Sequence, residues 1–268
     1  IDGIVCFDSS KVHKHETGNP QYAFAFKMSL DEQISKAEVV NVLWEPSMDG
    51  YLKPRIQIKP IKLVGTTITY ATAHNAKFVK DNVIGPGAII KIIRSGDVIP
   101  YIMEIIEPSK DKKPQMPEIE YEWNKTGVDI IATKIEGEVK NKVDTYKITH
   151  FFKTMDVKYI SSGIIAKMVA VGYDTVLKIL NANKDDLIKI DGIGETMINK
   201  IYDDIKIKIK QADLARFMDA SRIFGRGMGE RKLREITTQH PDIMKLQITD
   251  KEMVDKILDI QGFSDILA

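Results

Sequence analysis

The sequence has very little cysteine: Cys6 is the only one among its 268 residues. A single thiol allows neither a disulfide nor a cysteine-based zinc site within the chain, and it fits a reducing compartment. Long apolar runs are also missing, since none approaches the roughly 18 residues expected of a membrane-spanning helix, and no stretch resembles a signal peptide. We therefore expect an intracellular protein, cytoplasmic or associated with the nucleoid, without a membrane partner. The sequence leaves a viral source open.

The chain also has almost no net charge, formally +1. The charges are nevertheless unevenly placed: residues 51–100 contain eight lysines or arginines and two acidic residues, whereas residues 101–150 contain eight and ten. A basic region on a near-neutral protein indicates a nucleic-acid partner. A lysine-rich surface that simply faces solvent is an equally good interpretation of the charge alone.

Distinct patterns follow one another along the chain. Residues 1–36 contain two strand-like segments, "DGIVCF" and "YAFAFKM", separated by a polar loop. No methionine begins the sequence, and we expect these segments to be the last strands of a sheet that belongs to a longer protein. Residues 37–108 contain short strands separated by turn-forming residues, at spacings that predict a five-stranded barrel.

One turn of that barrel carries a candidate phosphate ligand. The segments "AIIKII" and "VIPYI" are rich in β-branched residues, which predicts two strands. Arg94, Ser95, Gly96 and Asp97 lie between them and are predicted to form a tight turn. Such a turn would present the Arg94 cation at the rim of the barrel, where it could hold a phosphate.

The second half of the chain is predicted to be helical. A proline-rich and highly charged stretch, "EPSKDKKPQMPEIEYE", opens the segment 109–149 and indicates a linker or an extended arm. Across residues 150–268, apolar residues recur at spacings of three and four, as in amphipathic helices. The predicted fold class is therefore α+β with several domains, in which a small β-barrel is followed by an all-α domain.

A small hairpin recurs in the helical half. Residues 192–194 (GIG) and 227–229 (GMG) lie between short helices, residues 262–264 (GFS) repeat the pattern, and residues 159–161 (YIS) match it poorly. Glycines allow a tight turn, and the next helix begins with unpaired N–H groups that can bind a DNA phosphate without reading a base. A single copy is more often an ordinary connection between helices, but four copies indicate helix-hairpin-helix motifs. Their predicted DNA-binding glycines are Gly192, Gly194, Gly227 and Gly229.

The order of these motifs resembles a known family. The segments "IDGIV", "YAFAFKM", "EPSMDGYLKP", "TYATAHNA" and "IGPGAIIKIIRSGDVIPYI", followed by the hairpins, resemble the C-terminal portion of an NAD-dependent DNA ligase over nearly the whole chain. The resemblance is weakest over residues 108–149. It implies the end of a nucleotidyltransferase (adenylation) domain in 1–36 and an oligonucleotide-binding (OB) fold in 37–108. A zinc-finger-like segment without zinc would follow in 109–149, then a helix-hairpin-helix domain in 150–268.

The resemblance also implies a chemistry. In that family a lysine takes AMP from NAD, AMP passes to the 5′-phosphate of a nick, and the 3′-hydroxyl then displaces it. Asp2, in "DGIV", would position AMP or a metal-bound phosphate, and Lys27, in "AFK", would neutralise charge on the transferred phosphate. NAD and Mg²⁺ are the implied cofactors, and nicked double-stranded DNA is the implied partner. Besides the hairpin glycines, the expected DNA-binding residues are Arg94, Ser95, Lys53 and Arg55.

The sequence departs from the family pattern at several positions. Phe7 stands where the family has a second lysine, and Met48-Asp49 replace an expected Arg-Thr pair in the first barrel turn. The four zinc-binding cysteines are missing, with Trp123 and Thr126 at the places of the first two. We therefore expect the chain to bind no zinc.

One K-x-D-G tetrapeptide, the signature of the AMP-accepting lysine, occurs at residues 189–192. In the family this motif precedes "DGIV", whereas here it lies inside a hairpin, and so short a pattern arises easily by chance. We therefore expect that Lys189 is not the nucleophile and that an upstream portion or a partner chain supplies it. The alternative function is a non-catalytic clamp protein or ligase subunit that binds duplex DNA.

Overall fold

A computed structural model describes residues 4–10, 12–13, 20–26, 34–63, 65–94 and 100–264. Three of the predicted site residues, Asp2, Lys27 and Ser95, lie outside the described residues. The chain divides into two compact units. We call them the barrel unit, Ile1–Glu45 with Tyr51–Lys134, and the helical unit, Pro46–Gly50 with Ile135–Ala268.

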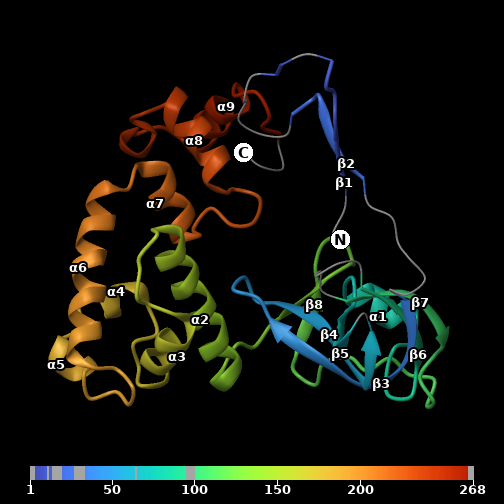
Figure 1. The fold of residues 1–268 in the computed structure, drawn as a ribbon. Helices are drawn as coiled ribbons and strands as arrows, with labels where there is room; N and C mark the ends of the chain where they lie inside the picture. Colours follow the sequence, from blue (N-terminus) through green and yellow to red (C-terminus); the bar gives the residue numbers. More distant parts are fainter. Residues whose placement is uncertain are drawn as a thin grey trace. The chain divides into compact units, whose positions relative to one another are not determined.

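Five strands form the body of the barrel unit (Figure 1). They are β3 (Ile34–Pro46), β4 (Tyr51–Leu63), β5 (Thr66–Thr72), β6 (Ile89–Ile93) and β7 (Tyr101–Glu107). The strand order is β3-β6-β7-β5-β4, and an additional pairing between β3 and β4 closes the sheet. The predicted five-stranded barrel is confirmed, and β6 and β7 are the antiparallel strands expected on either side of the Arg94 turn.

Alternating burial along the strands builds the barrel core. In β4, Ile56 and Ile58 are almost completely buried, while Arg55 between Pro54 and Ile56 is exposed. Successive side chains of a strand point to opposite faces, so the isoleucines fill the barrel and the cations of β4 stay on its outer surface. Ile90, Ile92 and Ile102 from β6 and β7 complete the core opposite them.

Two further strands precede the barrel. β1 (Ile4–Phe7) and β2 (Ala23–Phe26) pair antiparallel, with Ile4 opposite Phe26. These are the two strands predicted from "DGIVCF" and "YAFAFKM". Most of their apolar side chains are exposed, including Val5 and Phe24, so this small sheet contributes little to the barrel core.

The segment that its composition predicted to be a linker is held on the barrel. The Gln115 side chain accepts a hydrogen bond from the backbone N–H of Val42 (2.8 Å) and donates one to the Asn41 side chain (2.6 Å). The indole N–H of Trp44 donates to the Gln115 carbonyl at 3.1 Å. Ser109 is 2% exposed. Proline and charge made this stretch appear extended, but its polar groups pair with a strand more than 70 residues earlier in the chain.

A short hairpin occupies the place expected for the zinc-binding cysteines. β8 (Tyr121–Trp123) and β9 (Ile130–Ala132) pair antiparallel, and β9 pairs with the start of β4. The Asn124 side chain stabilises the turn by accepting hydrogen bonds from the N–H groups of Val128 (3.1 Å) and Asp129 (3.3 Å). Backbone pairing therefore organises this segment in addition to apolar contacts. The part of the chain that the structure describes contains no group of three or more potential metal ligands.

The helical unit contains helices and one 3₁₀ turn. They are α2 (Gly137–Thr154), α3 (Ser162–Ala170), α4 (Val176–Leu180), α5 (Lys184–Leu187), α6 (Glu195–Gln211), α7 (Leu214–Ser221), α8 (Glu230–Gln239), a 3₁₀ turn (Ile243–Lys245) and α9 (Asp250–Leu258). A short helix of the barrel unit, α1 (Ala76–Asp81), begins at Asn75, whose side chain accepts from the Phe78 N–H. Among the described residues, no helix has the length and apolar character needed to cross a bilayer.

Two separate apolar cores stabilise the helical unit. The first is built mainly from α2 to α6 and includes Phe152 and Ile198. The second is built from α7 to α9 and includes Leu233 and Ile260. This division groups the four predicted hairpins two by two, because residues 159–161 and 192–194 border the first core and residues 227–229 and 262–264 border the second.

Asp156 ties the end of α2 to α6. It follows α2 in a left-handed conformation (φ 57°), and its carboxylate accepts hydrogen bonds from the ammonium groups of Lys158 and Lys208, the latter at 2.7 Å. The two ammonium groups lower the pKa of Asp156 from 3.8 to about 2. A carboxyl whose pKa is lower in the folded state stabilises the fold above its unfolded pKa, and this contribution is lost as the pH falls toward the folded value.

We expect Asp156→Asn to be destabilising above pH 4 and much less so at pH 2, where about half of the carboxyl is protonated in the folded protein. The free energy of unfolding, measured by urea denaturation, should differ between wild type and variant by a constant amount near neutral pH. The difference should shrink between about pH 4 and pH 2, as Asp156 becomes protonated. Asp203→Asn, at an exposed position of α6, is the control variant. A difference for Asp156→Asn that is independent of pH would contradict the assigned ion pairs.

Candidate nucleic-acid interface

The four hairpins share one backbone conformation. Their first residues all have a positive φ: 65° at Tyr159, 75° at Gly192, 92° at Gly227 and 96° at Gly262. The middle residue of each is buried or packs partly against a core, whereas the third is exposed. The repeat seen in the sequence is therefore present in the structure, including the hairpin 159–161 that matched it poorly.

The hairpins differ in how the following helix begins. α6 starts at Gly194 and α8 at Gly229, both with extended backbone and without a side-chain hydrogen bond to the first turn. α3 instead starts at Ser161, whose hydroxyl accepts a hydrogen bond from the Ile164 N–H at 3.3 Å. Since the first N–H groups of a helix have no partner within the helix, those of α6 and α8 remain able to bind an anion.

Space for an anion exists at both uncapped helix ends. A Cβ atom built on Gly194 or Gly229 would meet no other atom within 4 Å. A bulky group can therefore approach the backbone closely at these two positions. At Gly192 a Cβ would come within 2.6 Å of the Lys167 ammonium, which itself donates to the Asp191 carbonyl at 2.7 Å. The hairpin 192–194 thus has a cation directly beside it.

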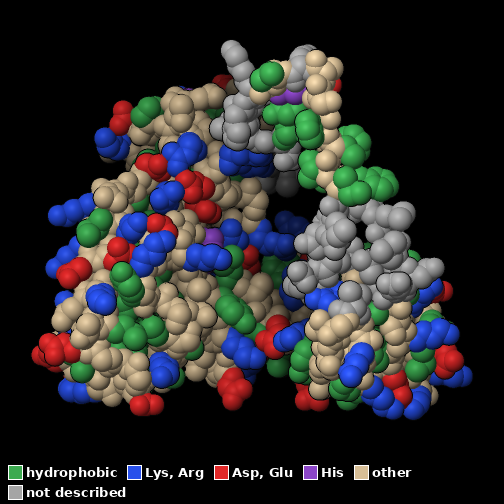
Figure 2. All heavy atoms as spheres, viewed as in Figure 1, with side chains coloured by type: hydrophobic (Ala, Val, Ile, Leu, Met, Phe, Trp, Pro, Cys, Tyr) green, Lys and Arg blue, Asp and Glu red, His purple; other side chains and the backbone are tan. Residues whose placement is uncertain are grey.

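Charge around the second uncapped end is also favourable. Glu230 opens α8, but its carboxylate is engaged by Arg234 (2.5 Å) and lies 3.7 Å from the Arg216 guanidinium. Arg226 and Arg231, next to the hairpin 227–229, are exposed. The carboxylate is therefore compensated, and cations predominate where a phosphate would approach. Over the visible face of the helical unit as a whole, basic and acidic side chains are interspersed (Figure 2).

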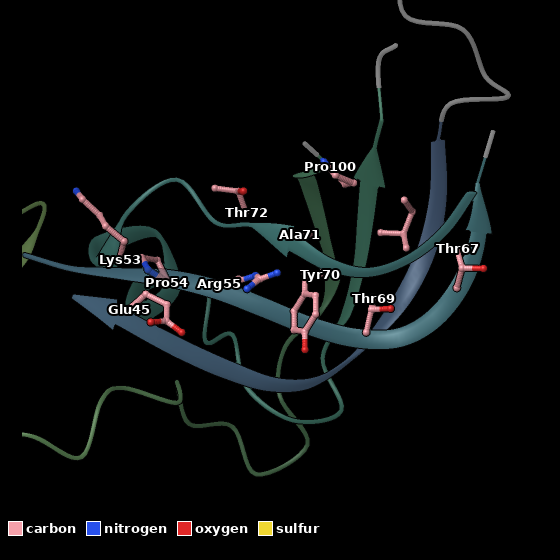
Figure 3. Close-up of a pocket in the computed structure, with 11 residues that line it drawn as sticks. Glu45, Lys53, Pro54, Arg55, Thr67, Thr69, Tyr70, Ala71, Thr72 and Pro100 are labelled. Carbon is pink, nitrogen blue, oxygen red and sulfur yellow. The ribbon is translucent and has the colours of Figure 1, made fainter. Parts of the chain in front are cut away.

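The barrel offers a second surface, a concave region of about 560 Å³ along β4 and β5 (Figure 3). The Arg55 guanidinium lies over the Tyr70 ring, with its central carbon 3.9 Å from the ring centroid. Threonines line the rest of the strand, at positions 67, 69 and 72. An exposed guanidinium stacked on an aromatic ring beside hydroxyl groups is suited to binding a polynucleotide backbone.

The other predicted barrel cations are placed differently. Lys53 lines the same region, but its ammonium bonds the Asp129 carboxylate at 2.7 Å, so a DNA phosphate would have to compete with that carboxylate. Arg94 follows β6, and its guanidinium donates to the Thr66 hydroxyl at 3.1 Å. The structure thus brings Lys53 and Arg55 together on one surface and places the Arg94 guanidinium against Thr66, the first residue of β5.

Sequence reasoning missed several candidate residues. Tyr70 was not recognised; it is half-buried and follows the buried Ile68 by two residues in "TTITYAT". Tyr159 was treated only as a poor match to glycine, and Lys167 lies 24 residues before the carbonyl group that it contacts. Alternation along β5 would have placed Tyr70 on the same face as the buried Ile68, and the Lys167 contact has no local signal.

Comparison with known proteins identifies the barrel. Residues 36–114 match the family model of the NAD-dependent DNA ligase OB-fold domain. The barrel is therefore similar to the OB-fold domain of NAD-dependent DNA ligases. The similarity extends beyond the barrel, because relatives named DNA ligase match the chain from end to end. The predicted resemblance to NAD-dependent DNA ligases is therefore confirmed.

The similar ligases come from viruses and bacteria. The DNA ligase of Acanthamoeba polyphaga mimivirus is 41% identical over 99% of this chain and 41% of its own length. A protein of Invertebrate iridescent virus 3 is 29% identical over 100% of this chain and 34% of its own length. The DNA ligase of Desulfatibacillum aliphaticivorans is 24% identical over 99% of this chain and 42% of its own length. The chain therefore spans about two fifths or less of the length of these three relatives.

The structure shows the contacts of two residues that do not follow the ligase pattern, Asp49 and Lys189. Asp49, in the turn where an Arg-Thr pair was expected, accepts a hydrogen bond from the Arg222 guanidinium at 2.9 Å. Lys189, in the K-x-D-G tetrapeptide, forms an ion pair with Asp186 at 2.7 Å, and this hydrogen bond raises the pKa of the lysine. A nucleophilic lysine requires a lowered pKa, so this environment supports the prediction that Lys189 does not accept AMP.

Proposed function

We propose that the chain is the DNA-holding part of an NAD-dependent DNA ligase and supports AMP transfer and sealing on nicked double-stranded DNA. The observation that carries the proposal is the pair of uncapped, sterically open helix ends at Gly194 and Gly229, in the same chain as a ligase-family OB fold. N–H groups at such ends bind phosphates. Arg55 and Arg94 would add cationic contacts from the barrel. Ser95 and Lys53 belong to the same proposed surface.

The catalytic roles are assigned to Asp2 and Lys27. In the sequence, Asp2 stands two residues before Ile4, and Lys27 directly follows Phe26. Ile4 and Phe26 pair with each other across β1 and β2, and this pairing supports a shared site. A carboxylate and an ammonium suit a nucleotide phosphate with its metal ion, so the two residue types fit NAD and Mg²⁺. NAD would supply the AMP. Lys27 would stabilise the negative charge of the transferred phosphate, and Asp2 would position it. The acceptor lysine would come from the upstream portion or from a partner chain.

A non-catalytic clamp is the second candidate function. It is favoured by Lys189, because the K-x-D-G lysine of this chain is held in an ion pair and lies in a hairpin of the helical unit. A clamp would use the same phosphate contacts without taking part in AMP transfer. Duplex binding is therefore common to both candidates, and chemistry separates them.

Duplex binding should depend strongly on salt and hardly on sequence. The two arginines give two charge-neutralising phosphate contacts, so the logarithm of the affinity should fall with the logarithm of salt concentration with a slope of about −2 or steeper. Fluorescence anisotropy with nicked duplexes of different sequence, between about 50 and 200 mM salt, measures this. Arg94→Gln should reduce the slope by about one. A slope near zero, or an affinity that follows base sequence, would contradict the proposed interface.

A further inference from the structure

Tyr159 has a conformation that its side chain does not favour. It occupies the first position of the hairpin 159–161 with φ 65°, where the other three hairpins have glycine. Left-handed backbone is uncommon for bulky residues and costs free energy relative to glycine. The ring gains little from packing in return, since Tyr159 is 61% exposed. Stability of the fold therefore does not explain a tyrosine at this position.

The hairpin around Tyr159 is firmly held. Ile160 packs against the first helical core, and the Ser161 hydroxyl caps α3. On the other side, the backbone N–H of Lys158 donates to the Asp204 carboxylate at 2.6 Å. These contacts fix the backbone on both sides of the tyrosine. The ring is consequently presented to solvent from a rigid turn.

A cation stands over the exposed ring. The Lys200 ammonium lies 5.7 Å from the centroid of the Tyr159 ring. Lys200 belongs to α6, the helix that begins at the uncapped Gly194. In addition, Ile160 and Ile193, the middle residues of the two hairpins, pack against the same core. The tyrosine, the lysine and the proposed phosphate-binding hairpin 192–194 therefore belong to one packed group.

We propose that Tyr159 contacts the flat face of a nucleotide in the bound DNA, next to the phosphate held at residues 192–194. The inference rests on the proposed function, because it assumes that the hairpins bind DNA. In this hairpin the Ser161 hydroxyl accepts a hydrogen bond from the Ile164 N–H and so caps α3, and an exposed aromatic ring stands where the other hairpins have glycine. Aromatic rings bind nucleotide faces independently of base identity. Lys200 would pair with a neighbouring phosphate while remaining over the ring.

Tyr159→Gly is the informative substitution. It restores the residue of the other hairpins and relieves the left-handed strain, so the thermal unfolding midpoint should be unchanged or higher. Affinity for a nicked duplex should nevertheless fall at least about fivefold, the lower end of what loss of one aromatic contact costs. Tyr159→Phe should bind like wild type, since it keeps the ring. Tyr146→Ala, which removes a 41% exposed tyrosine from α2, is the control and should leave affinity unchanged.

The comparison of nicked and intact duplexes locates the contact. A larger loss on the nicked duplex places the ring on the base exposed at the break and supports the proposal. An equal loss on both duplexes would contradict it, because the stacked bases of an intact duplex offer no free face. Wild-type affinity in a folded Tyr159→Gly protein would refute it while leaving the proposed function intact. Absence of duplex binding by the wild-type chain would refute both.

Discussion

Replacing both Gly194 and Gly229 with valine is expected to reduce duplex affinity on the order of a hundredfold, without unfolding the helical unit. The valine side chains would stand between the helix N–H groups and the approaching phosphates. Hydrogen bonds to a charged group contribute about 1.5–3 kcal/mol each, and losing even one such bond at each helix end accounts for this effect. Titration of the double variant with a fluorescent nicked duplex, at one fixed salt concentration, measures it.

The fold should tolerate these two substitutions. Gly194 and Gly229 have φ of −96° and −86°, which valine adopts readily, and a Cβ at either position meets no atom within 4 Å. Glycine and valine differ as helix N-caps by about 1 kcal/mol or less, so circular dichroism and the unfolding midpoint should change little. Ala170→Val, on the exposed end of α3, is the control for added bulk. Undiminished affinity in the folded double variant would exclude these helix ends as phosphate ligands.

Gly192 and Gly227 should respond differently. Their φ values of 75° and 92° lie in the region that valine avoids. Valine at these positions should therefore lower stability as well as binding. In these two hairpins the sequence pattern hides this difference: the glycine at the first position permits the turn, and the glycine at the third position leaves room for the ligand. Only the backbone conformation separates the two roles.

The sequence predicted the main elements because local patterns determine them. Short runs rich in β-branched residues between turn-forming residues predicted the barrel strands, and spacings of three and four predicted the helices. The hairpins were recognised where glycine marks them. At Tyr159 the glycine signal is missing, yet Ile160 still packs against the core and the same turn forms. Burial of the middle residue therefore determines this turn even where the first residue disfavours it.

Contacts between distant residues could not be predicted in this way. Gln115 pairs with β3, Lys53 with Asp129 and Arg222 with Asp49, over separations of 73, 76 and 173 residues. No local pattern encodes such partners. They matter for the site because the contacts of Lys53 and Arg222 engage charges that could otherwise bind a ligand, and the contact of Gln115 attaches the predicted linker to β3. The predicted linker is thus held on the barrel, and Lys53 has a carboxylate partner already in the free protein.

The last prediction separates the ligase from the clamp. The chain alone should form no covalent AMP adduct with NAD and should seal no nicks, because its K-x-D-G lysine, Lys189, lies in a hairpin of the helical unit, where it forms an exposed ion pair with Asp186. Supplied with the upstream portion, by fusion or as a second chain, it should support sealing. In that reconstituted protein Lys27→Ala should lower the rate of sealing by several orders of magnitude, since charge stabilisation at a transferred phosphate is a large part of such catalysis.

Binding and chemistry respond to different residues in this scheme, which makes the test decisive. Lys27→Ala should leave the affinity for a nicked duplex nearly unchanged, because the proposed DNA contacts lie in the hairpins and the barrel. The Gly194 and Gly229 double variant should instead bind DNA more weakly but keep its sealing rate at saturating DNA. Gel analysis of labelled AMP transfer and of nick closure measures both steps.

Labelling of Lys189 in the isolated chain would overturn its exclusion as the nucleophile. Full sealing by the Lys27→Ala form would remove the catalytic role of Lys27, and failure of every reconstituted form to transfer AMP would leave the clamp as the function.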